Sequence, residues 1–343
     1  MAQLLSTKMS SVNIISESGR FEQDILRSYL PSEARDCHAI AIIGSQNKGK
    51  STILNRIFGT AFATLPAGQF QQTTKGIHAV VLDNLLILDV EGFDSYERHD
   101  QEVSRATEED KTGVEANIEA KLNLFILMVA DVIVINVLAN DICCASGLKL
   151  LENILKDYKS LKQSNPSIKR KKILYFVRDF SRNSCPGDVI RNKINDNFKK
   201  ACSRCSFSEA ELADSFELQV HPVVNYEMPQ FQQDVDNLKT MFRSDELYAD
   251  SRLLNTQDMC EVYGFIWDSV RKCEGVNMPN IRSFVLDLKF RQLQQMMLLE
   301  FKREADKHST KGSSSLEASL RTLSQKYESD FNSAGKRLII DFS

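Results

Sequence analysis

A glycine-rich loop between an apolar run and an amphipathic segment constrains this chain more than any other feature. Residues 38–43 form the apolar run and predict a buried strand, and residues 51–58 carry apolar side chains at helical spacing. The loop between them fits the P-loop pattern with Gly44, Ser45, Gln46, Asn47, Lys48, Gly49, Lys50 and Ser51. Its glycines let successive N–H groups curl around phosphates, and the positive end of the following helix faces the same anion. The loop therefore predicts a nucleotide site.

Two side chains of this loop are expected to carry its chemistry. We expect the ammonium group of Lys50 to reach the β- and γ-phosphates, and the hydroxyl of Ser51 to ligate Mg²⁺. The other loop residues, and Thr52 directly after them, are expected to contact the nucleotide. The alternative, a degenerate loop, leaves the strand and helix on its two sides unexplained.

An acidic tetrapeptide, Asp89-Val90-Glu91-Gly92, ends a second apolar run at residues 85–90. We expect the Asp89 carboxylate to hold the Mg²⁺ shell through water, and the Gly92 amide to bind the γ-phosphate and sense its loss. After a P-loop, this order favours a GTPase-like switch over a kinase. An ordinary strand-to-turn Asp and Gly is the alternative.

A loop with two threonines lies between these motifs, at residues 71–76. A threonine hydroxyl here can supply a second oxygen to Mg²⁺, which would order the loop only in the triphosphate state. We predict Thr74 in this role, with Thr73 in reserve. Composition alone fits a plain surface loop equally well.

An Arg178-Asp179 pair follows an apolar strand-like run. A carboxylate in this place accepts two hydrogen bonds from the N1 and N2 donors of guanine. Adenine lacks that donor pair, so Asp179 is predicted to select GTP. The alternative is a surface ion pair, because Arg-Asp is a common dipeptide.

Strands and helices alternate along most of the chain. The predicted strands cover residues 38–43, two runs within 77–90 around a turn at Asp83-Asn84, 131–138, 172–177 and 217–224. The predicted helices between them cover residues 51–58 and 147–161. This alternation predicts an α/β protein of the P-loop GTPase fold, with a mostly parallel sheet flanked by helices.

A helical C-terminal region follows. From Leu286 the apolar positions step by three or four, which predicts a long amphipathic helix. A Gly/Ser-rich break at residues 308–315 precedes a second helical stripe. We therefore divide the chain into a lead-in segment at 1–36, a large GTPase domain at 37–287 and a helical region at 288–343, the start of a stalk or bundle.

The bulk composition excludes several classes of partner. A net charge of −3 over 343 residues gives no electrostatic case for nucleic acid. No secretory signal opens the chain, so its eight cysteines are expected to be free thiols in a reducing compartment. The apolar stretch 122–138 is interrupted by Asp131 and Asn136, and we interpret it as a helix running into a buried strand. Cys202 and Cys205 lack a second pair to complete a zinc site.

Four other residues invite a functional interpretation. We expect Trp267 to pack in the core, and neither His78 nor His99 has a partner that marks it as a general base. His221 opens the segment 221–227, which either frames the guanine or is an ordinary strand end.

The four motifs together resemble the guanylate-binding-protein and atlastin class, in which Arg-Asp replaces the usual base-reading motif. The similarity is greatest to the Root Hair Defective and Sey-type GTPases of the endoplasmic reticulum. It covers roughly residues 12–288. The segments that carry it are Lys50-Ser51-Thr52 with Asn55, Phe58-Gly59-Thr60, Gln72 to Ile77, Leu88 to Gly92, Val177-Arg178-Asp179, Gly264 to Trp267 and Met278-Pro279.

This resemblance implies a Mg²⁺-dependent GTP hydrolase of the dynamin-like type. It also implies GTP-dependent homodimerisation of G domains, coupled to membrane fusion or network shaping at the endoplasmic reticulum. Localisation would be cytoplasmic, or at the cytosolic face of that organelle, with membrane contact through a segment absent from this sequence.

Two departures from the family pattern leave alternatives open. Asn47 stands where atlastins and guanylate-binding proteins carry an arginine finger, and Lys48 is the nearest replacement cation. The region 97–121 is longer and more charged than the family's second switch. Hydrolysis is therefore expected to be slow or dependent on dimerisation. A nucleotide-dependent interaction module with little turnover is the first alternative, and a P-loop kinase is the second.

Overall fold

The computed structural model describes residues 9–31, 33, 35–64, 74–92, 118–142, 145–164, 170–181, 186–249, 254–272, 278–308 and 313–342. The chain forms two compact units, Met1–Val276 and Asn277–Ser343. Our division at residues 36 and 287 remains a proposal beside this one, and the two units are described separately.

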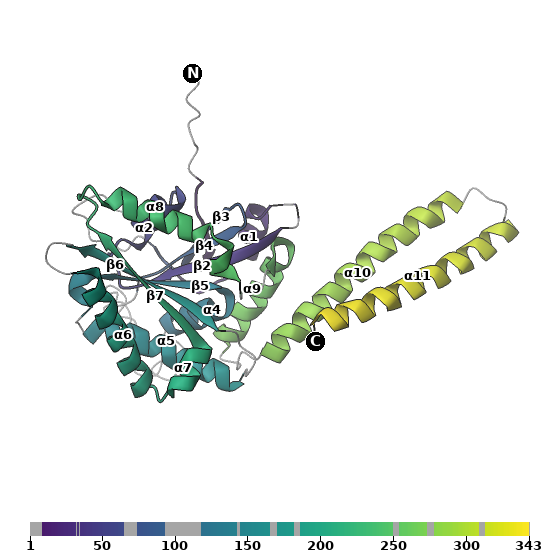
Figure 1. Cartoon of the computed structure of the whole chain (residues 1–343). Helices are drawn as coiled ribbons and strands as arrows, with labels where there is room; N and C mark the ends of the chain where they lie inside the picture. The colour runs from purple at the N-terminus through teal and green to yellow at the C-terminus, as the bar shows by residue number, and fades with distance from the viewer. Residues whose placement is uncertain are drawn as a thin grey trace, which may run out of the picture. The chain divides into compact units, whose positions relative to one another are not determined.

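The first unit is built on a mostly parallel sheet, as predicted (Figure 1). Its strand order is β1-β3-β4-β2-β5-β6-β7, and β8 pairs with the start of β2. The strands are β1 Val12–Ile15, β2 Asp36–Ile43, β3 Ile77–Leu82, β4 Leu85–Val90, β5 Val132–Leu138, β6 Lys171–Phe180, β7 Phe216–Val224 and β8 Leu254–Asn255. Strands β4, β2, β5, β6 and β7 run parallel, whereas β3 returns antiparallel to β4 and β1 antiparallel to β3.

Helices cover both faces of this sheet. They are α1 Gln23–Tyr29, α2 Lys50–Phe58, α4 Ile118–Val129, α5 Ala145–Ser164, α6 Gly187–Arg204, α7 Glu209–Ser215, α8 Phe231–Phe242 and α9 Thr256–Arg271, with 3-10 turns at Ala139–Asp141 and Asp245–Tyr248. Helix α2 packs on α8, and α4, α5 and α6 follow one another on the opposite face (Figure 1).

The central strands are buried on both faces, which explains their continuous apolar sequences. All six residues of β4 are buried, and so are residues 39–43 of β2. Trp267 on α9 is 1% exposed and packs edge-to-face on Phe125, which confirms its predicted place in the core. The stretch 122–138 divides into the end of α4 and β5, as predicted.

The parallel arrangement decides where a ligand can bind. Parallel strands present their carboxyl ends at one edge of the sheet, and the loops after β2, β4 and β6 all leave from that edge. These are the loops that contain the predicted nucleotide-binding residues.

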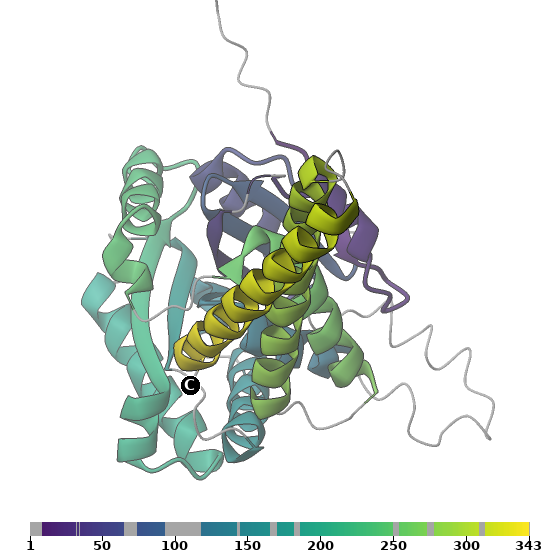
Figure 2. The same ribbon diagram turned by 90° about the vertical axis from the view of Figure 1, so that its right-hand side faces the viewer.

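The second unit is a helical hairpin of α10 Met278–His308 and α11 Ser313–Phe342. The two helices lie side by side, with ring contacts between Phe290 and Phe331 and between Phe301 and Tyr327 (Figure 2). The first helix begins at Met278, eight residues before Leu286. Pro279, its second residue, is compatible with a first helical turn. Among the described helices, none is long and apolar enough to cross a bilayer.

Candidate functional site

The P-loop begins where β2 ends and closes into the first turn of α2. Its backbone enters the left-handed region at Asn47 (φ 57°) and Gly49 (φ 71°). The positive φ of Gly49 favours glycine, and a Cβ atom there would also lie 2.4 Å from Nη1 of Arg178 and displace its guanidinium group. The predicted loop therefore has the curled backbone that its glycines imply.

Lys50 lies inside this curl. Its side chain is 6% exposed, and its Nζ donates to the carbonyl oxygens of Gly44 at 3.0 Å and Ser45 at 3.1 Å. Burial lowers the pKa of Lys50 to about 8, while the nearby carboxylates of Asp89 and Glu91 oppose that shift. A buried cation held by carbonyls has a high affinity for an incoming phosphate.

Three oxygen-bearing side chains from three separate segments meet beside Lys50. Ser51 Oγ donates to Asp89 Oδ2 at 2.6 Å, and Thr74 Oγ1 donates to the same oxygen at 3.1 Å. The two hydroxyl oxygens are 3.3 Å apart. These are the residues predicted to surround Mg²⁺, and the structure brings all three together.

Asp89 fits a cation at this place. The residue is 1% exposed, and its Oδ1 atom has no hydrogen-bond partner among the described residues. Burial raises the pKa of Asp89, with Lys50 and the two hydroxyls acting against the rise. An unpaired buried carboxylate oxygen is costly, and a hard divalent cation prefers all-oxygen surroundings. The donor set therefore suits Mg²⁺.

Gly92 lies against the P-loop. A Cβ atom there would be 2.5 Å from the Cα atom of Gln46 and 2.9 Å from Nζ of Lys50. The close approach leaves room for a backbone amide and excludes any larger residue, in agreement with the predicted contact to a terminal phosphate.

Glu91, which we did not predict as a site residue, links two segments that we call the first switch segment (described residues 74–76) and the second switch segment (residues 89–92). Its carboxylate accepts a hydrogen bond from the Gly76 N–H at 2.7 Å, and its own N–H donates to the Gly76 carbonyl at 2.8 Å. Glu91 is 3% exposed, so the clamp is shielded from water. Its position inside the Asp89–Gly92 tetrapeptide was the available signal.

Arg178 points under the P-loop. It is 7% exposed, and its Nη1 donates to the Gly49 carbonyl at 2.6 Å. Asn136 on β5, also missed as a site residue, donates from Nδ2 to the Lys48 carbonyl at 2.8 Å. These two side chains hold the backbone of the loop from below, and a polar residue within an apolar strand was the signal for Asn136.

Asp179 turns the opposite way. It is exposed, its φ is 57°, and the β6–β7 ladder shifts register between Arg178 and Phe180. This bulge releases Asp179 from the ladder and leaves its carboxylate available at the carboxyl edge. Arg178 therefore contacts the P-loop, whereas Asp179 faces solvent, and its predicted contact with guanine stays a prediction.

The remaining loop residues have mixed positions. Lys48 Nζ pairs with Asp141 Oδ2 at 3.0 Å, so its charge is engaged by a carboxylate. Asn47 and Thr52 are exposed. Thr73 and His99 lie outside the described residues. Asn13 Nδ2 lies 3.1 Å from Nε2 of His78, and burial lowers the pKa of His78.

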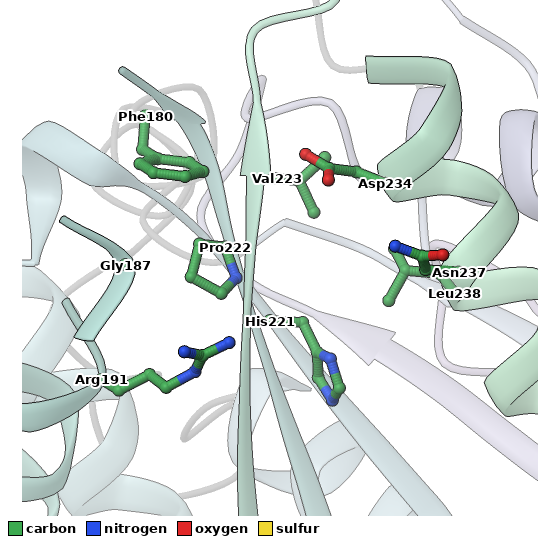
Figure 3. Close-up of a pocket in the computed structure, with 9 residues that line it drawn as sticks. All are labelled: Phe180, Gly187, Arg191, His221, Pro222, Val223, Asp234, Asn237 and Leu238. Atoms are coloured by element: carbon green, nitrogen blue, oxygen red, sulfur yellow. The ribbon is translucent and has the colours of Figure 1, made fainter. Parts of the chain in front are cut away.

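A cavity of about 320 Å³ lies between the ends of β6 and β7 and the helices α6 and α8 (Figure 3). Its lining includes Phe180, Arg191, His221, Pro222 and Asp234. Burial lowers the pKa of His221 to about 4, with the positive Arg191 acting in the same direction, so the imidazole is neutral near pH 7. The role of residues 221–227 around a purine stays a prediction.

Comparison with known proteins identifies similar sequences. A family described as "Root hair defective 3 GTP-binding protein (RHD3) GTPase domain" matches residues 43–262. Protein SEY1 homolog 2 of Trichomonas vaginalis is 30% identical over 285 residues, which cover 78% of this chain and 34% of that protein. Protein sey1 of Schizosaccharomyces japonicus is 33% identical over 178 residues, covering 50% of this chain and 21% of that protein. The chain thus spans about a third of the first of these relatives.

Solved structures give a weaker similarity. Era in complex with MgGDPNP and a fragment of 16S ribosomal RNA aligns with a TM-score of 0.35 and 18% identity, over 60% of this chain and 56% of Era. The fold assignment rests instead on the strand order and the P-loop.

Proposed function

This chain belongs to the RHD3 family of dynamin-like GTPases, and from that premise we propose that its P-loop pocket binds Mg²⁺ and GTP and hydrolyses the γ-phosphate. The convergence of Ser51, Thr74 and Asp89 beside the buried ammonium group of Lys50 carries this proposal. If these residues only stabilised the fold, the buried Oδ1 atom of Asp89 would have a hydrogen-bond partner among the described residues, and it has none.

Each residue has a part in this reaction. Lys50 and the curled N–H groups of residues 44–51 stabilise negative charge on the β- and γ-phosphate oxygens. The Gly92 amide contacts the γ-phosphate, and Thr74, which already donates to Asp89, would exchange that hydrogen bond for the metal while the phosphate is present. Mg²⁺, when bound, neutralises charge on the phosphate oxygens. Ser51 and Thr74 would hold the metal directly and Asp89 through water, and closure of the switch segments would orient the attacking water.

Recognition of the base is assigned to Asp179. Its exposed carboxylate accepts from the N1 and N2 donors of guanine, a pair that adenine lacks. Arg178 supports this recognition indirectly, because it fixes the loop that grips the phosphates of the same nucleotide.

The proposal for the wider function is based on the relatives and on the family to which the chain belongs. We propose that GTP binding makes two copies of the GTPase domain associate, and that this association serves membrane fusion or network shaping at the cytosolic face of the endoplasmic reticulum. The helical hairpin of α10 and α11 is the element through which such a change would reach the rest of the protein. Relatives named SEY1 support this assignment.

A module with little turnover is the second candidate. Two observations favour it: Asn47 cannot supply the charge of an arginine finger, and Asp141 already pairs with Lys48. In that case the site would bind GTP and act as a nucleotide-dependent contact surface.

Multiple-turnover phosphate release at low and high protein concentration separates the candidates. We expect Mg²⁺-dependent release from GTP whose rate per molecule rises with concentration, because dimerisation completes the site. Absence of release at every concentration, together with tight GTP binding, would favour the module. Transfer of phosphate to a small acceptor in place of water would indicate a kinase.

A further inference from the structure

The N-terminal strand and the turn after it lie directly against the first switch segment. Asn13 of β1 donates from Nδ2 to the Lys75 carbonyl at 3.1 Å, and Glu17 pairs with Lys75 Nζ at 2.7 Å. Lys75 is the residue after Thr74, so both contacts act one residue from the predicted metal ligand. Neither contact belongs to the P-loop motifs.

The backbone of β1 also lies close to Gly76, the residue after Lys75. A Cβ atom on Gly76 would lie only 1.8 Å from the Ile15 carbonyl oxygen, and Gly76 has a φ of 71°. Switch residues 75 and 76 are therefore held from one side by β1 and, through Glu91, from the other side by the end of β4. These two supports fix the position of the residues that directly follow Thr74.

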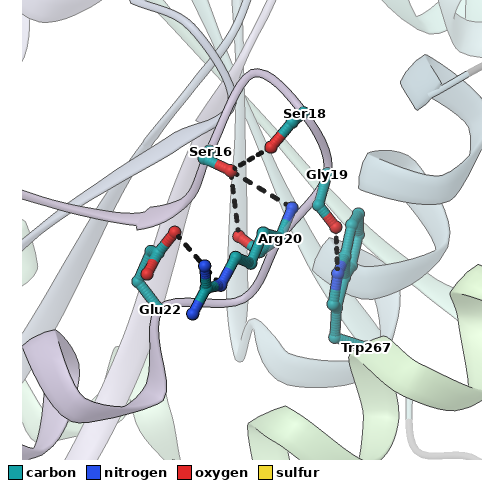
Figure 4. Close-up of polar contacts among 6 residues, drawn as sticks. All are labelled: Ser16, Ser18, Gly19, Arg20, Glu22 and Trp267. Atoms are coloured by element: carbon teal, nitrogen blue, oxygen red, sulfur yellow. Dashed lines mark hydrogen bonds and ion pairs between the residues drawn. The ribbon is translucent and has the colours of Figure 1, made fainter.

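The turn itself is fixed by hydrogen bonds within residues 16–20. Ser16 N–H donates to the Arg20 carbonyl at 2.9 Å, Gly19 N–H donates to the Ser16 carbonyl at 2.9 Å, and the Ser16 hydroxyl accepts from the Arg20 N–H at 3.2 Å. Figure 4 shows the contacts of the Ser16 hydroxyl with Ser18 and Arg20, with the indole ring of Trp267 beside the turn. The turn is thus closed by its own hydrogen bonds.

Trp267 of α9 anchors this turn to the core. Its indole N–H donates to the Gly19 carbonyl at 2.9 Å across 248 positions of sequence, and the bond is buried (Figure 4). The ring is held in turn by Phe125 of α4 at a centroid distance of 5.6 Å. A Cβ atom on Gly19 would lie 3.3 Å from Ile118, the first residue of α4, and 3.8 Å from the Trp267 ring, so the turn packs closely on both helices.

We propose that the turn at residues 16–20 is a positioning element for Thr74, in which Asn13 and Glu17 hold Lys75 and Trp267 fixes the turn to α9. The proposal rests on the proposed function, because it assigns these residues to the metal-binding state of the same site. Trp267 acts through the turn and touches neither nucleotide nor metal. The same contacts report the state of Thr74 to α9, the last helix of the first unit.

The chain offers a direct probe of this coupling, because Trp267 is its only tryptophan. Its emission should differ between the complex with Mg²⁺ and a non-hydrolysable GTP analogue and the complex with Mg²⁺ and GDP, since only the first would exchange the hydrogen bond of Thr74 to Asp89 for the metal. In Asn13→Ala and Glu17→Gln, which cut the link to Lys75, this difference should shrink while both nucleotides still bind.

A Mg²⁺ titration of phosphate release provides a second readout. Loss of one hydrogen bond should raise the Mg²⁺ concentration for half-maximal activity by about threefold to tenfold. Loss of the half-exposed Glu17–Lys75 ion pair should raise it by about twofold to fivefold, because solvent screens that pair. We expect such a rise in Asn13→Ala, Glu17→Gln and Trp267→Phe, the last of which keeps a ring but loses the donor to Gly19. The KM for GTP should change much less, because Lys50 and the P-loop are intact.

Glu152→Gln is the matched control. It neutralises a carboxylate that pairs with Arg204 at the same 2.7 Å distance as Glu17 with Lys75, on helices α5 and α6. It should leave both the emission difference and the Mg²⁺ dependence unchanged.

Some results would overturn this inference and leave the proposed function intact. They are a wild-type Mg²⁺ dependence in Asn13→Ala and Glu17→Gln, and identical Trp267 emission with the two nucleotides. A Mg²⁺ dependence altered equally in Glu152→Gln would also overturn it, since the effect would not be specific to the turn. Failure of the unaltered chain to bind any nucleotide would refute the proposed function as well. Glu17→Gln, at a half-exposed site, keeps the test valid if Asn13→Ala does not fold.

Discussion

Ser51 Oγ lies 2.6 Å from Asp89 Oδ2, although the two residues are 38 positions apart in the sequence. The parallel pairing of β2 with β4 brings them together, because Asp89 near the end of β4 pairs with Ile42, and the loop that leads to Ser51 leaves β2 directly after Ile43. Thr74 joins them at 3.1 Å from the third segment. The oxygen cluster is thus assembled by the fold, before any ligand is considered.

Removal of the buried ammonium group should abolish nucleotide binding. In Lys50→Ala, the phosphates lose a desolvated cation, and we expect affinity for GTP to fall at least about a hundredfold, or roughly 3 kcal/mol. Isothermal titration with GTP and Mg²⁺ measures this. Lys200→Ala, which alters an exposed lysine on α6, should bind like the unaltered chain, and tight binding by Lys50→Ala would contradict the site.

Exchange of the base-reading acid should affect selectivity. In Asp179→Asn, an amide replaces one acceptor oxygen with a donor, so the preference for GTP over ATP should fall about tenfold to a hundredfold. Competition of GTP and ATP against a fluorescent guanine nucleotide gives the ratio. Asp196→Asn on the exposed face of α6 is the control. An unchanged ratio would remove Asp179 from base recognition.

The neighbouring arginine should behave differently. Arg178→Lys keeps a positive charge but loses the guanidinium N–H that reaches the Gly49 carbonyl. We expect affinity for all nucleotides to fall by about threefold to thirtyfold, with the guanine preference retained. A selective loss of guanine preference, measured in the same competition assay, would show that Arg178 reads the base itself.

A methyl group at Gly92 should block the closed arrangement of the switch. The added carbon of Gly92→Ala would lie 2.5 Å from the Gln46 Cα atom, and backbone cannot retreat as a flexible side chain can. Overpacking of this kind costs about 1–3 kcal/mol, which predicts a fall in kcat/KM of roughly tenfold to a hundredfold. GDP affinity, which does not need the γ-phosphate contact, should change little. Equal losses for GDP and GTP would indicate general misfolding of the loop instead.

The affinity for GTP should depend on pH through Lys50. Its pKa in the nucleotide-free protein is lowered to about 8, mainly by burial, so above that pH binding must take up a proton. Affinity should therefore fall as pH rises from 8 towards 10. The contribution of Lys50 to stability has the opposite sign. Its folded pKa lies below the unfolded value of 10.5, so Lys50 binds more protons in the unfolded chain between about pH 8 and 10.5, and its contribution to the stability of the free protein rises with pH. Calorimetric titrations at several pH values check the first trend, and denaturant unfolding checks the second.

The sequence predicted the parts of the site that depend on local order. A strand, a glycine-rich loop and a helix occur consecutively in residues 38–58, so their geometry follows from the chain itself. The same holds for Asp89 at the end of β4. These predictions needed only the rule that parallel strands end at a common edge.

Long-range contacts could not be predicted in this way. The inward direction of Arg178 depends on the register of β6 against β5 and on the height of the loop above it, and neither is encoded near residue 178. Strand β1 is only four residues long and pairs with β3 antiparallel, so its short pattern resembles a lead-in segment. Its contacts with Lys75 became visible only in three dimensions.

The central claim is most directly tested by a crystal structure of this chain with Mg²⁺ and a non-hydrolysable GTP analogue. The account predicts the phosphates inside the P-loop against Lys50, a magnesium ion bound by the Ser51 and Thr74 hydroxyls with Asp89 behind it, and the guanine on Asp179. A well-folded molecule with an empty loop, or with the purine bound away from Asp179, would contradict it.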